Sequence, residues 1–171
     1  AFISDIHVGS KIFQEKNFLK FIEWVNGQSG SEEQKAEARK VKYILITGDR
    51  GDGIGVYPGQ EDKLSITDIR LQYKRLAELL SMIRKDIIIV MCPGQHDAVH
   101  VHEPQPPLGP KFAEDIYNLD NIILVSNPAF LEVGNKKGEG VRILMYHGAS
   151  FYTMINEIEE LRFGNANEQP T

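Results

Sequence analysis

The spacing of hydrophobic residues changes along the chain between that of strands and that of helices. Short apolar runs rich in β-branched residues, stopped by polar or glycine-rich turns, predict buried strands. These strands are residues 1–6, 41–46, 87–91 and 121–125. Apolar residues at helical spacing predict helices. These helices are residues 13–25, 68–83, 112–119 and 151–161.

The order of these elements indicates the class of fold. Strands at 41–46 and 87–91 flank a helix, and such a strand–helix–strand unit forms a parallel sheet with a right-handed crossover. An antiparallel hairpin is predicted at 129–133 and 141–146, joined by a glycine-rich segment. The helix at 151–161 is expected to cover the sheet. We therefore interpret the chain as an α/β protein.

Local composition decides the remaining segments. Residues 28–40 are charged and lack large apolar side chains, so we predict a solvated loop or a frayed helix. Thr67 is the predicted N-cap of the helix at 68–83, since a threonine hydroxyl can accept a hydrogen bond from the first turn. His100 and His102 lie in a proline-rich loop with no strand to position them, and we expect them at the surface.

Residues that bind metal ions or transfer protons stand at the ends of four apolar runs. They are Asp5 and His7, then Asp49 and Asp52, then Gln95, His96 and Asp97, and finally His147. Because the carboxyl ends of parallel strands meet at one edge of a sheet, we expect these side chains to form a single site. Imidazole together with carboxylate suits manganese, iron or zinc better than it suits calcium or magnesium.

Three positions near these strand ends suggest finer roles. Asp5 and His7 are two residues apart in an extended segment, so both side chains point to the same side and can bind one ion. His96 is a candidate general acid whose ring is oriented by Asp97 or by another acceptor. Tyr57 lies in a turn-rich segment at the edge of the expected site, where it either stacks on a nucleic-acid base or packs within its loop.

Composition limits the classes of function. The 171 residues suit one α/β domain with an ample core. The formal charge of −5 argues against a broad basic surface for nucleic acid, so any such contact must be local, metal-assisted or shared with a partner. The single cysteine, Cys92, excludes an internal disulfide and fits a reducing cytoplasm. No apolar stretch approaches the roughly 20 residues that span a bilayer, so no membrane partner is expected.

Taken in order, four motifs resemble those of the calcineurin-like metallophosphoesterases. The motifs are Asp5-Ile-His7, Gly48-Asp49-x-x-Asp52, Gly94-Gln95-His96-Asp97 and Tyr146-His147-Gly148. Within that superfamily, residues 52–60, 92–98 and 103–106 resemble the small subunits of archaeal family D DNA polymerases. The resemblance implies an α/β sandwich of mixed β-sheets flanked by helices. It also implies that residues 1–171 form a catalytic domain.

The resemblance assigns roles to individual residues. It implies that Asp5 and His7 bind the first of two divalent metal ions, that Asp49 bridges both, and that Gln95 and His147 bind the second. The ions would be manganese, with iron, zinc or magnesium as alternatives. His96 would act as the general acid or stabilise charge on the phosphorus oxygens, and Asp97 completes the catalytic pair.

The resemblance also implies a function. The expected function is that of a cytoplasmic 3′–5′ exonuclease, which hydrolyses DNA phosphodiesters at 3′ ends for proofreading. The expected protein partner is the large polymerising subunit, with the sliding clamp as a further candidate. Two alternatives remain open, namely a non-catalytic scaffold for the large subunit and a phosphoesterase with another substrate.

Three departures from the family pattern qualify these expectations. Gln95 stands where the family has asparagine, and Arg50 and Gly51 stand where apolar residues are common. No Gly-His-x-His motif follows His147. We therefore expect the domain to be incomplete at its C-terminus, and also at its N-terminus because the first strand is already under way at Ala1. The chain alone is expected to bind metal weakly and to have little activity.

Overall fold

The computed structural model describes residues 1–134 and 140–163. The predicted connection within the hairpin, residues 135–139, and the polar segment 164–171 lie outside the described residues. The strands are β1 (Phe2–Ile3), β2 (Tyr43–Thr47), β3 (Ile88–Cys92), β4 (Ile122–Leu124), β5 (Ala129–Val133) and β6 (Val141–Met145). The helices are α1 (Glu15–Val25), α2 (Glu32–Lys40), the 3-10 helix η1 (Gln60–Lys63), α3 (Ile69–Ser81), α4 (Pro110–Tyr117), α5 (Ser150–Glu157) and α6 (Glu159–Arg162).

Two sheets organise the molecule. Strands β1 to β4 form a parallel sheet in the order β1-β2-β3-β4, with Leu45 opposite both Phe2 and Val90. Strands β5 and β6 pair antiparallel, with Phe130 opposite Leu144. The predicted α/β class, the central parallel strands and the hairpin are therefore confirmed.

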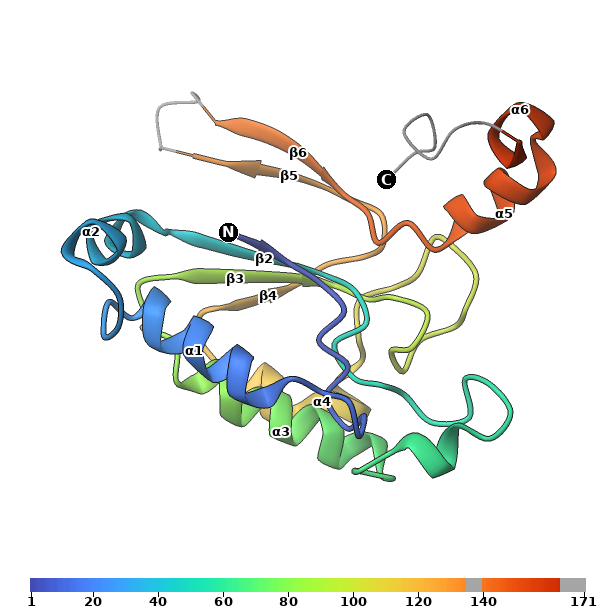
Figure 1. Cartoon of the computed structure of the whole chain (residues 1–171), viewed down its shortest axis with the longest axis horizontal. Helices are drawn as coiled ribbons and strands as arrows, with labels where there is room; N and C mark the ends of the chain where they lie inside the picture. Colours follow the sequence, from blue (N-terminus) through green and yellow to red (C-terminus); the bar gives the residue numbers. More distant parts are fainter. Residues whose placement is uncertain (135–139, 164–171) are drawn as a thin grey trace.

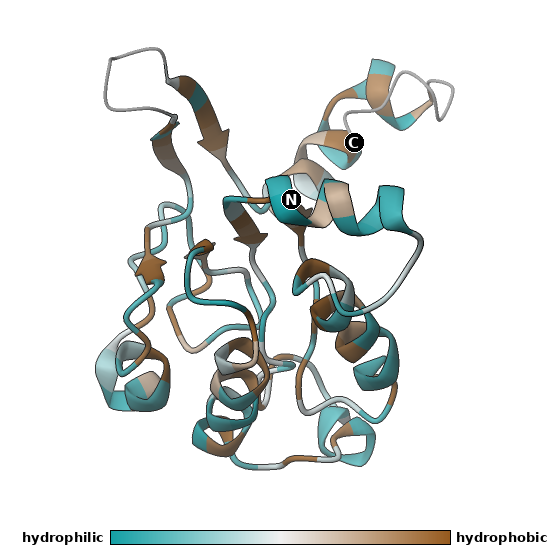
Figure 2. Ribbon diagram, turned by 90° about the vertical axis from the view of Figure 1, so that its left-hand side faces the viewer, coloured by the Kyte–Doolittle hydropathy of each residue, from teal (hydrophilic) through white to brown (hydrophobic). Residues whose placement is uncertain are grey.

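Strands β2 and β3 are apolar on both faces, and this produces three layers (Figure 1). Ile46 and Met91 face helices α1, α3 and α4 in the larger core cluster. Leu45 and Val90 point to the opposite side and pack against the hairpin through Met145. Successive side chains of a strand alternate between faces, so a continuous apolar run is what a strand buried on both sides requires. Figure 2 shows hydrophobic residues along these central strands.

Two local predictions differ from the structure at helix ends. Residues 28–40, predicted as a solvated loop or a frayed helix, do contain an exposed helix, α2, but it is regular, because Ser31 and Gln34 form a reciprocal capping box that compensates for the lack of an apolar face. The N-cap of α3 is Asp68 rather than Thr67: its carboxylate accepts hydrogen bonds from the backbone N–H groups of Arg70 and Leu71. His100 and His102 are exposed, as predicted.

The prediction that residues 151–161 cover the sheet was also wrong. These residues form α5 and α6, which contribute no buried side chain. Both helices lie at the periphery, away from the helical layer (Figure 1). The hairpin covers the second face of the sheet instead. No helix in the described part of the chain is long and apolar enough to cross a membrane.

Cys92 provides a direct test of the packing between sheet and hairpin. Its side chain is fully buried, and burial raises the pKa of the thiol to about 11. We expect the native protein at pH 8 to react with a thiol reagent at least about 100-fold more slowly than the protein unfolded in guanidinium, because almost no thiolate is present. Equal rates in the two states, measured by release of the reagent's chromophore, would show that the hairpin does not cover β3.

Candidate metal centre

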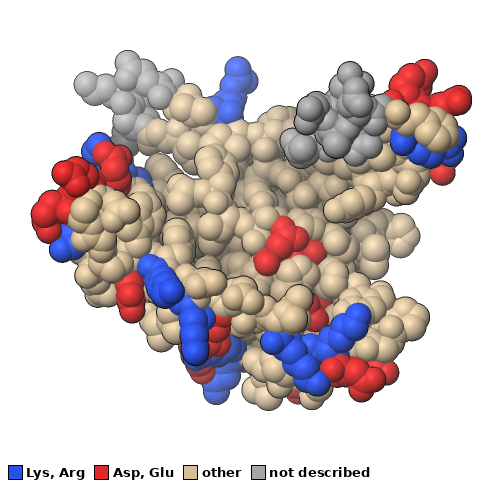
Figure 3. All heavy atoms as spheres, viewed as in Figure 1, with Lys and Arg blue, Asp and Glu red and all other residues tan. Residues whose placement is uncertain are grey.

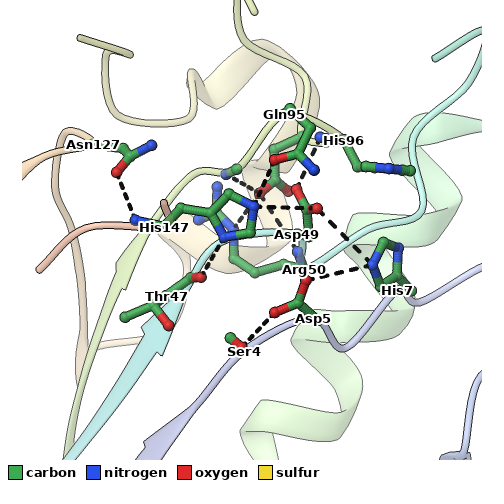
Figure 4. Close-up of polar contacts among 12 residues, drawn as sticks. Ser4, Asp5, His7, Thr47, Asp49, Arg50, Gln95, His96, Asn127 and His147 are labelled. Carbon is green, nitrogen blue, oxygen red and sulfur yellow. Dashed lines mark hydrogen bonds and ion pairs between the residues drawn. The ribbon is translucent and has the colours of Figure 1, made fainter. Parts of the chain in front are cut away.

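The predicted site residues meet where the parallel strands end (Figure 4). Asp5 follows β1, Asp49 follows β2 and Gln95 follows β3. His147 follows β6, so it reaches the same place from the hairpin layer. Three of these segments follow parallel strands, as the sequence predicted, whereas His147 follows a strand of the antiparallel hairpin, which the argument from parallel strands did not cover.

Three of these residues have a left-handed backbone. Asp5, His7 and Asp49 have φ angles of 52°, 51° and 46°. Each such residue other than glycine costs about 1–3 kcal/mol and is found mostly at functional sites. Backbone hydrogen bonds hold the conformation: the His7 N–H donates to the Asp49 carbonyl at 3.0 Å, and the Asp5 N–H to the Gly48 carbonyl at 3.3 Å.

Asp49 lies at the centre of the cluster. Its side chain is 1% exposed. Oδ2 lies 3.3 Å from His147 Nε2 and 3.9 Å from His7 Nε2, while Oδ1 accepts the His96 backbone N–H at 2.9 Å. Asp5 Oδ1 is 3.8 Å from the same His7 nitrogen. One carboxylate therefore stands between two imidazoles, with a second carboxylate beside one of them.

The two imidazoles are held by their Nδ1 atoms. His147 Nδ1 lies 2.8 Å from the Thr47 carbonyl oxygen, and His7 Nδ1 lies 2.9 Å from Asp52 Oδ1. Both Nε2 atoms are thereby turned toward Asp49. Gln95 Oε1 approaches His147 Nε2 to 2.6 Å, so the amide oxygen reaches the cluster despite its longer stem.

Charge coupling within the cluster is strong. Burial alone would raise the pKa of Asp49, but hydrogen bonds from His147 and from the His96 backbone outweigh it and lower that pKa. Burial alone would lower the pKa of His147, yet its hydrogen bond and charge interaction with Asp49 raise that pKa to about 9. Both ring nitrogens of His147 lie beside oxygen atoms: Nδ1 faces the Thr47 carbonyl, and Nε2 faces Gln95 Oε1 and Asp49 Oδ2.

The ring of His96 is oriented by an acceptor other than Asp97, which was the second alternative left open by the sequence. Its Nδ1 lies 2.7 Å from the Asp52 carbonyl oxygen, and its ring meets His7 edge-on with centroids 4.8 Å apart. Asp97 points elsewhere, into the protein. The predicted contact between Asp97 and the His96 ring is therefore replaced by the contact to Asp52, because the backbone turns sharply between the two neighbours.

Asp97 instead belongs to a buried polar group behind the site. Its carboxylate accepts hydrogen bonds from Arg50 Nε at 3.2 Å, from the Tyr73 hydroxyl at 3.0 Å and from the Gly94 N–H at 3.0 Å. The side chains of Arg50 and Asp97 are completely buried. Arg50 thus links the loop after β2 to the loop after β3.

The donor set fits divalent cations. Asp5, Asp49 and His147 each offer a ligand atom within 4.8 Å of the others, and so do His7, Asp52 and His96. In the second group Nδ1 of His7 is already engaged by Asp52, which leaves its Nε2 for the Asp49 side. Mixed carboxylate, imidazole and amide donors suit transition-metal ions.

Two further residues complete the site: Asp52, which the sequence placed there without an individual role, and Asn127, which the sequence did not indicate. Asp52 orients His7 and His96 at once, one through its carboxylate and one through its carbonyl. Asn127 is buried, and its side-chain oxygen accepts the His147 N–H at 2.9 Å. The spacing of Asp52 after Asp49 was a visible signal. Asn127 gave none, because it precedes a proline in a loop and meets His147 only through the tertiary fold.

Comparison with known proteins agrees with this geometry. The sequence model of the calcineurin-like phosphoesterases matches residues 1–170. The chain is 48% identical to the DNA polymerase II small subunit of Methanothermobacter thermautotrophicus over 161 residues, 94% of the chain. It is 46% identical to that of Archaeoglobus fulgidus over 165 residues and 43% identical to that of Pyrococcus furiosus over 159 residues, covering 95% and 93% of the chain. It spans only 32%, 32% and 25% of these three relatives, respectively.

Close packing at Gly94 predicts that its replacement damages the cluster. A Cβ there would lie 2.2 Å from Asp49 Oδ1 and 2.6 Å from the Asp49 backbone nitrogen. We expect Gly94→Ala to lower stability by about 1–3 kcal/mol and to weaken metal binding at least tenfold, because Asp49 must move. Calorimetric titration with Mn²⁺ and thermal unfolding measure the two effects.

Gly109→Ala is the matched control. A Cβ at Gly109 meets no atom within 4 Å, and the residue has an ordinary φ of −76°. It should leave both quantities nearly unchanged. Equal metal affinity in the two variants would mean that the Asp49 carboxylate takes no part in binding.

The buried pair behind the site predicts a large loss of stability in Asp97→Ala. The substitution leaves the Arg50 guanidinium buried without its carboxylate, and breaking such a pair costs about 3–5 kcal/mol. The exposed pair Lys40–Glu37 provides the comparison, since Glu37→Ala should change stability by less than about 1 kcal/mol. Denaturant unfolding measures both. If Asp97→Ala and Glu37→Ala lowered the free energy of unfolding by similarly small amounts, the Arg50–Asp97 pair would not be needed for stability.

Proposed function

The chain belongs to the calcineurin-like phosphoesterase family, and we propose that it is the metal-dependent 3′–5′ exonuclease domain of an archaeal DNA polymerase small subunit. One observation carries the chemistry: a buried carboxylate, Asp49, lies between the Nε2 atoms of His7 and His147. The relatives, which are DNA polymerase II small subunits, support DNA as the proposed substrate. Because the chain spans a minor share of each relative, the proposal concerns its role within the complete protein.

The roles of the ligands follow their positions. In this proposal Asp5 and His7 hold one divalent cation, Asp49 is shared, and Gln95 and His147 hold a second. We propose manganese, since imidazole and amide donors accompany the carboxylates. Such a cation pair polarises a phosphodiester, lowers the pKa of a water nucleophile and neutralises charge in the transition state.

His96 is the proposed proton donor. Its Nδ1 is held by the Asp52 carbonyl, so Nε2 is the nitrogen left for the substrate. As an imidazolium it would protonate the leaving 3′ oxygen or stabilise charge on the phosphate. Asp97 acts at a distance: by accepting the Gly94 N–H it fixes the turn that carries Gln95 and His96.

The proposed partners are the large polymerising subunit and DNA 3′ ends, with the sliding clamp as a further candidate. A proofreading domain needs only brief, local contact with DNA. The formal charge of −5 is compatible with that, because a metal pair and a few lysines can attract one phosphodiester without a broad basic surface. The large subunit would then deliver frayed ends to the site.

A scaffold role is the second candidate, and one surface favours it. Phe130 and Leu144 pair across the outer face of the hairpin and are 84% and 56% exposed. Exposed apolar pairs of this kind are typical of protein interfaces. A well-folded complete subunit that binds the large subunit but no metal would favour the scaffold over the nuclease.

Nuclease activity is tested on the complete subunit with Mn²⁺ and 5′-labelled single-stranded DNA. We expect stepwise shortening by the unmodified protein. Asp49→Asn should lose bound metal and more than about 100-fold in rate, because the shared ligand is gone. Glu37→Ala, on exposed α2, serves as the control for handling and folding. Intact DNA with the unmodified, metal-loaded protein would refute the proposal.

The role of His96 is tested separately. His96→Ala should lower kcat by about 10²–10⁴-fold while the number of bound metal ions stays the same, since the ring donates a proton but is not one of the proposed ligands. Metal content is measured by atomic emission on the same samples. Loss of metal together with activity would instead place His96 among the ligands.

A further inference from the structure

We propose that the cleft beside Asp5 and His7 binds the base of the terminal nucleotide, with Tyr57 as the stacking platform. This inference rests on the proposed function and extends it by naming the substrate contact. The sequence left Tyr57 undecided between stacking on a base and packing within its loop. The structure places it in a cleft that opens directly onto the metal centre.

The cleft has the size of a small-ligand site. Its volume is about 760 Å³, within the range of pockets that hold nucleotide-sized ligands. Its lining includes Asp5, His7 and His96 of the candidate metal centre. A phosphate at the metal centre would therefore have its own nucleoside inside this cleft rather than in solvent.

Aromatic rings line the cleft beyond the metal centre. Tyr57 is 37% exposed and lies next to His96, with ring centroids 6.3 Å apart. Phe13 and Phe18 belong to the same wall, but both are packed against the main core. Tyr57 is thus the most exposed of these three rings. Lys63 lies over one face of the ring, so the opposite face is the proposed stacking surface, and stacking on a base does not depend on the DNA sequence.

Two lysines contribute positive charge to the cleft. Lys63 Nζ lies 5.2 Å from the centre of the Tyr57 ring, and Lys11 Nζ donates to the Asp62 carbonyl at 2.7 Å. Both lysines line the cleft. Figure 3 shows basic side chains gathered over the start of α1, below an acidic patch where β1 ends. The cleft therefore combines acidic side chains that suit metal ions with lysines that offset the negative charge of a bound phosphodiester.

The order of the rings fits one nucleotide. His7 contacts His96, and His96 contacts Tyr57, so the platform lies one ring beyond the proposed proton donor. In this arrangement the base of the terminal nucleotide, on the 3′ side of the phosphate to be cleaved, contacts Tyr57. The chemistry favours single-stranded or frayed DNA, because a base held in the duplex by pairing and stacking cannot turn into the cleft.

The test measures binding without cleavage. The complete subunit with Mn²⁺ is titrated with single-stranded DNA that ends in fluorescent 2-aminopurine and carries a sulfur-substituted terminal phosphodiester to slow hydrolysis. A second oligonucleotide has an abasic 3′ end. We expect quenching of the 2-aminopurine on binding, and tighter binding of the base-bearing end.

Tyr57→Ala should remove the quenching and weaken binding of the base-bearing end by about 5- to 150-fold, while binding of the abasic end stays unchanged. Tyr57→Phe should keep both properties, because stacking needs the ring and not the hydroxyl. Tyr152→Ala, which removes an exposed tyrosine on α5, is the matched control and should resemble the unmodified protein.

The outcomes separate this inference from the nuclease proposal. Tyr57-dependent quenching by a protein that cleaves no DNA supports the base site and refutes the nuclease. Cleavage that is normal in Tyr57→Ala, with unchanged quenching, refutes the base site and leaves the nuclease intact. Equal loss of binding for base-bearing and abasic ends also refutes it, because Tyr57 would then support the fold or a protein contact.

Discussion

The site depends on one buried carboxylate. Asp49 uses one oxygen to hold the backbone of the β3 loop through His96, and directs the other toward His147 and His7. The parallel sheet brings these loops to the same edge, and the hairpin adds His147 from the opposite layer. Gly48 and Gly94 allow this closeness, because a Cβ on either would collide with His147 or with Asp49 itself.

A second polar layer supports the first. Behind the site, Arg50 and Asp97 form an ion pair without solvent contact, and both Arg50 Nη atoms lack a hydrogen-bond partner in the described structure. Such a pair adds little net stability after the cost of desolvation, so its main contribution is to fix the geometry of the loops. It fixes the loop after β2 to the loop after β3, and the Tyr73 hydroxyl joins α3 to the same point.

Much of this arrangement was predictable from the sequence. The apolar runs located β2 and β3, and the polar residues that end them located the site, because the rim of a parallel sheet is a consequence of topology. The family resemblance was confirmed by the match over residues 1–170. The failures were tertiary or at capping positions. The helical spacing in residues 151–161 predicts helices but not the surface on which they pack. The capping box of α2 and the contact of Asn127 with His147 leave no trace in the periodicity of hydrophobic residues.

The left-handed backbone at Asp5, His7 and Asp49 has a thermodynamic consequence for ligand binding. The free-energy cost of this strained backbone is incurred during folding, when β1 pairs with β2. The donor atoms are therefore aimed before any cation arrives, and capture of a cation loses little conformational entropy. A preorganised set of ligands also selects among metal ions by their radius. Side chains held on a fixed backbone cannot move to fit an ion that is too small or too large.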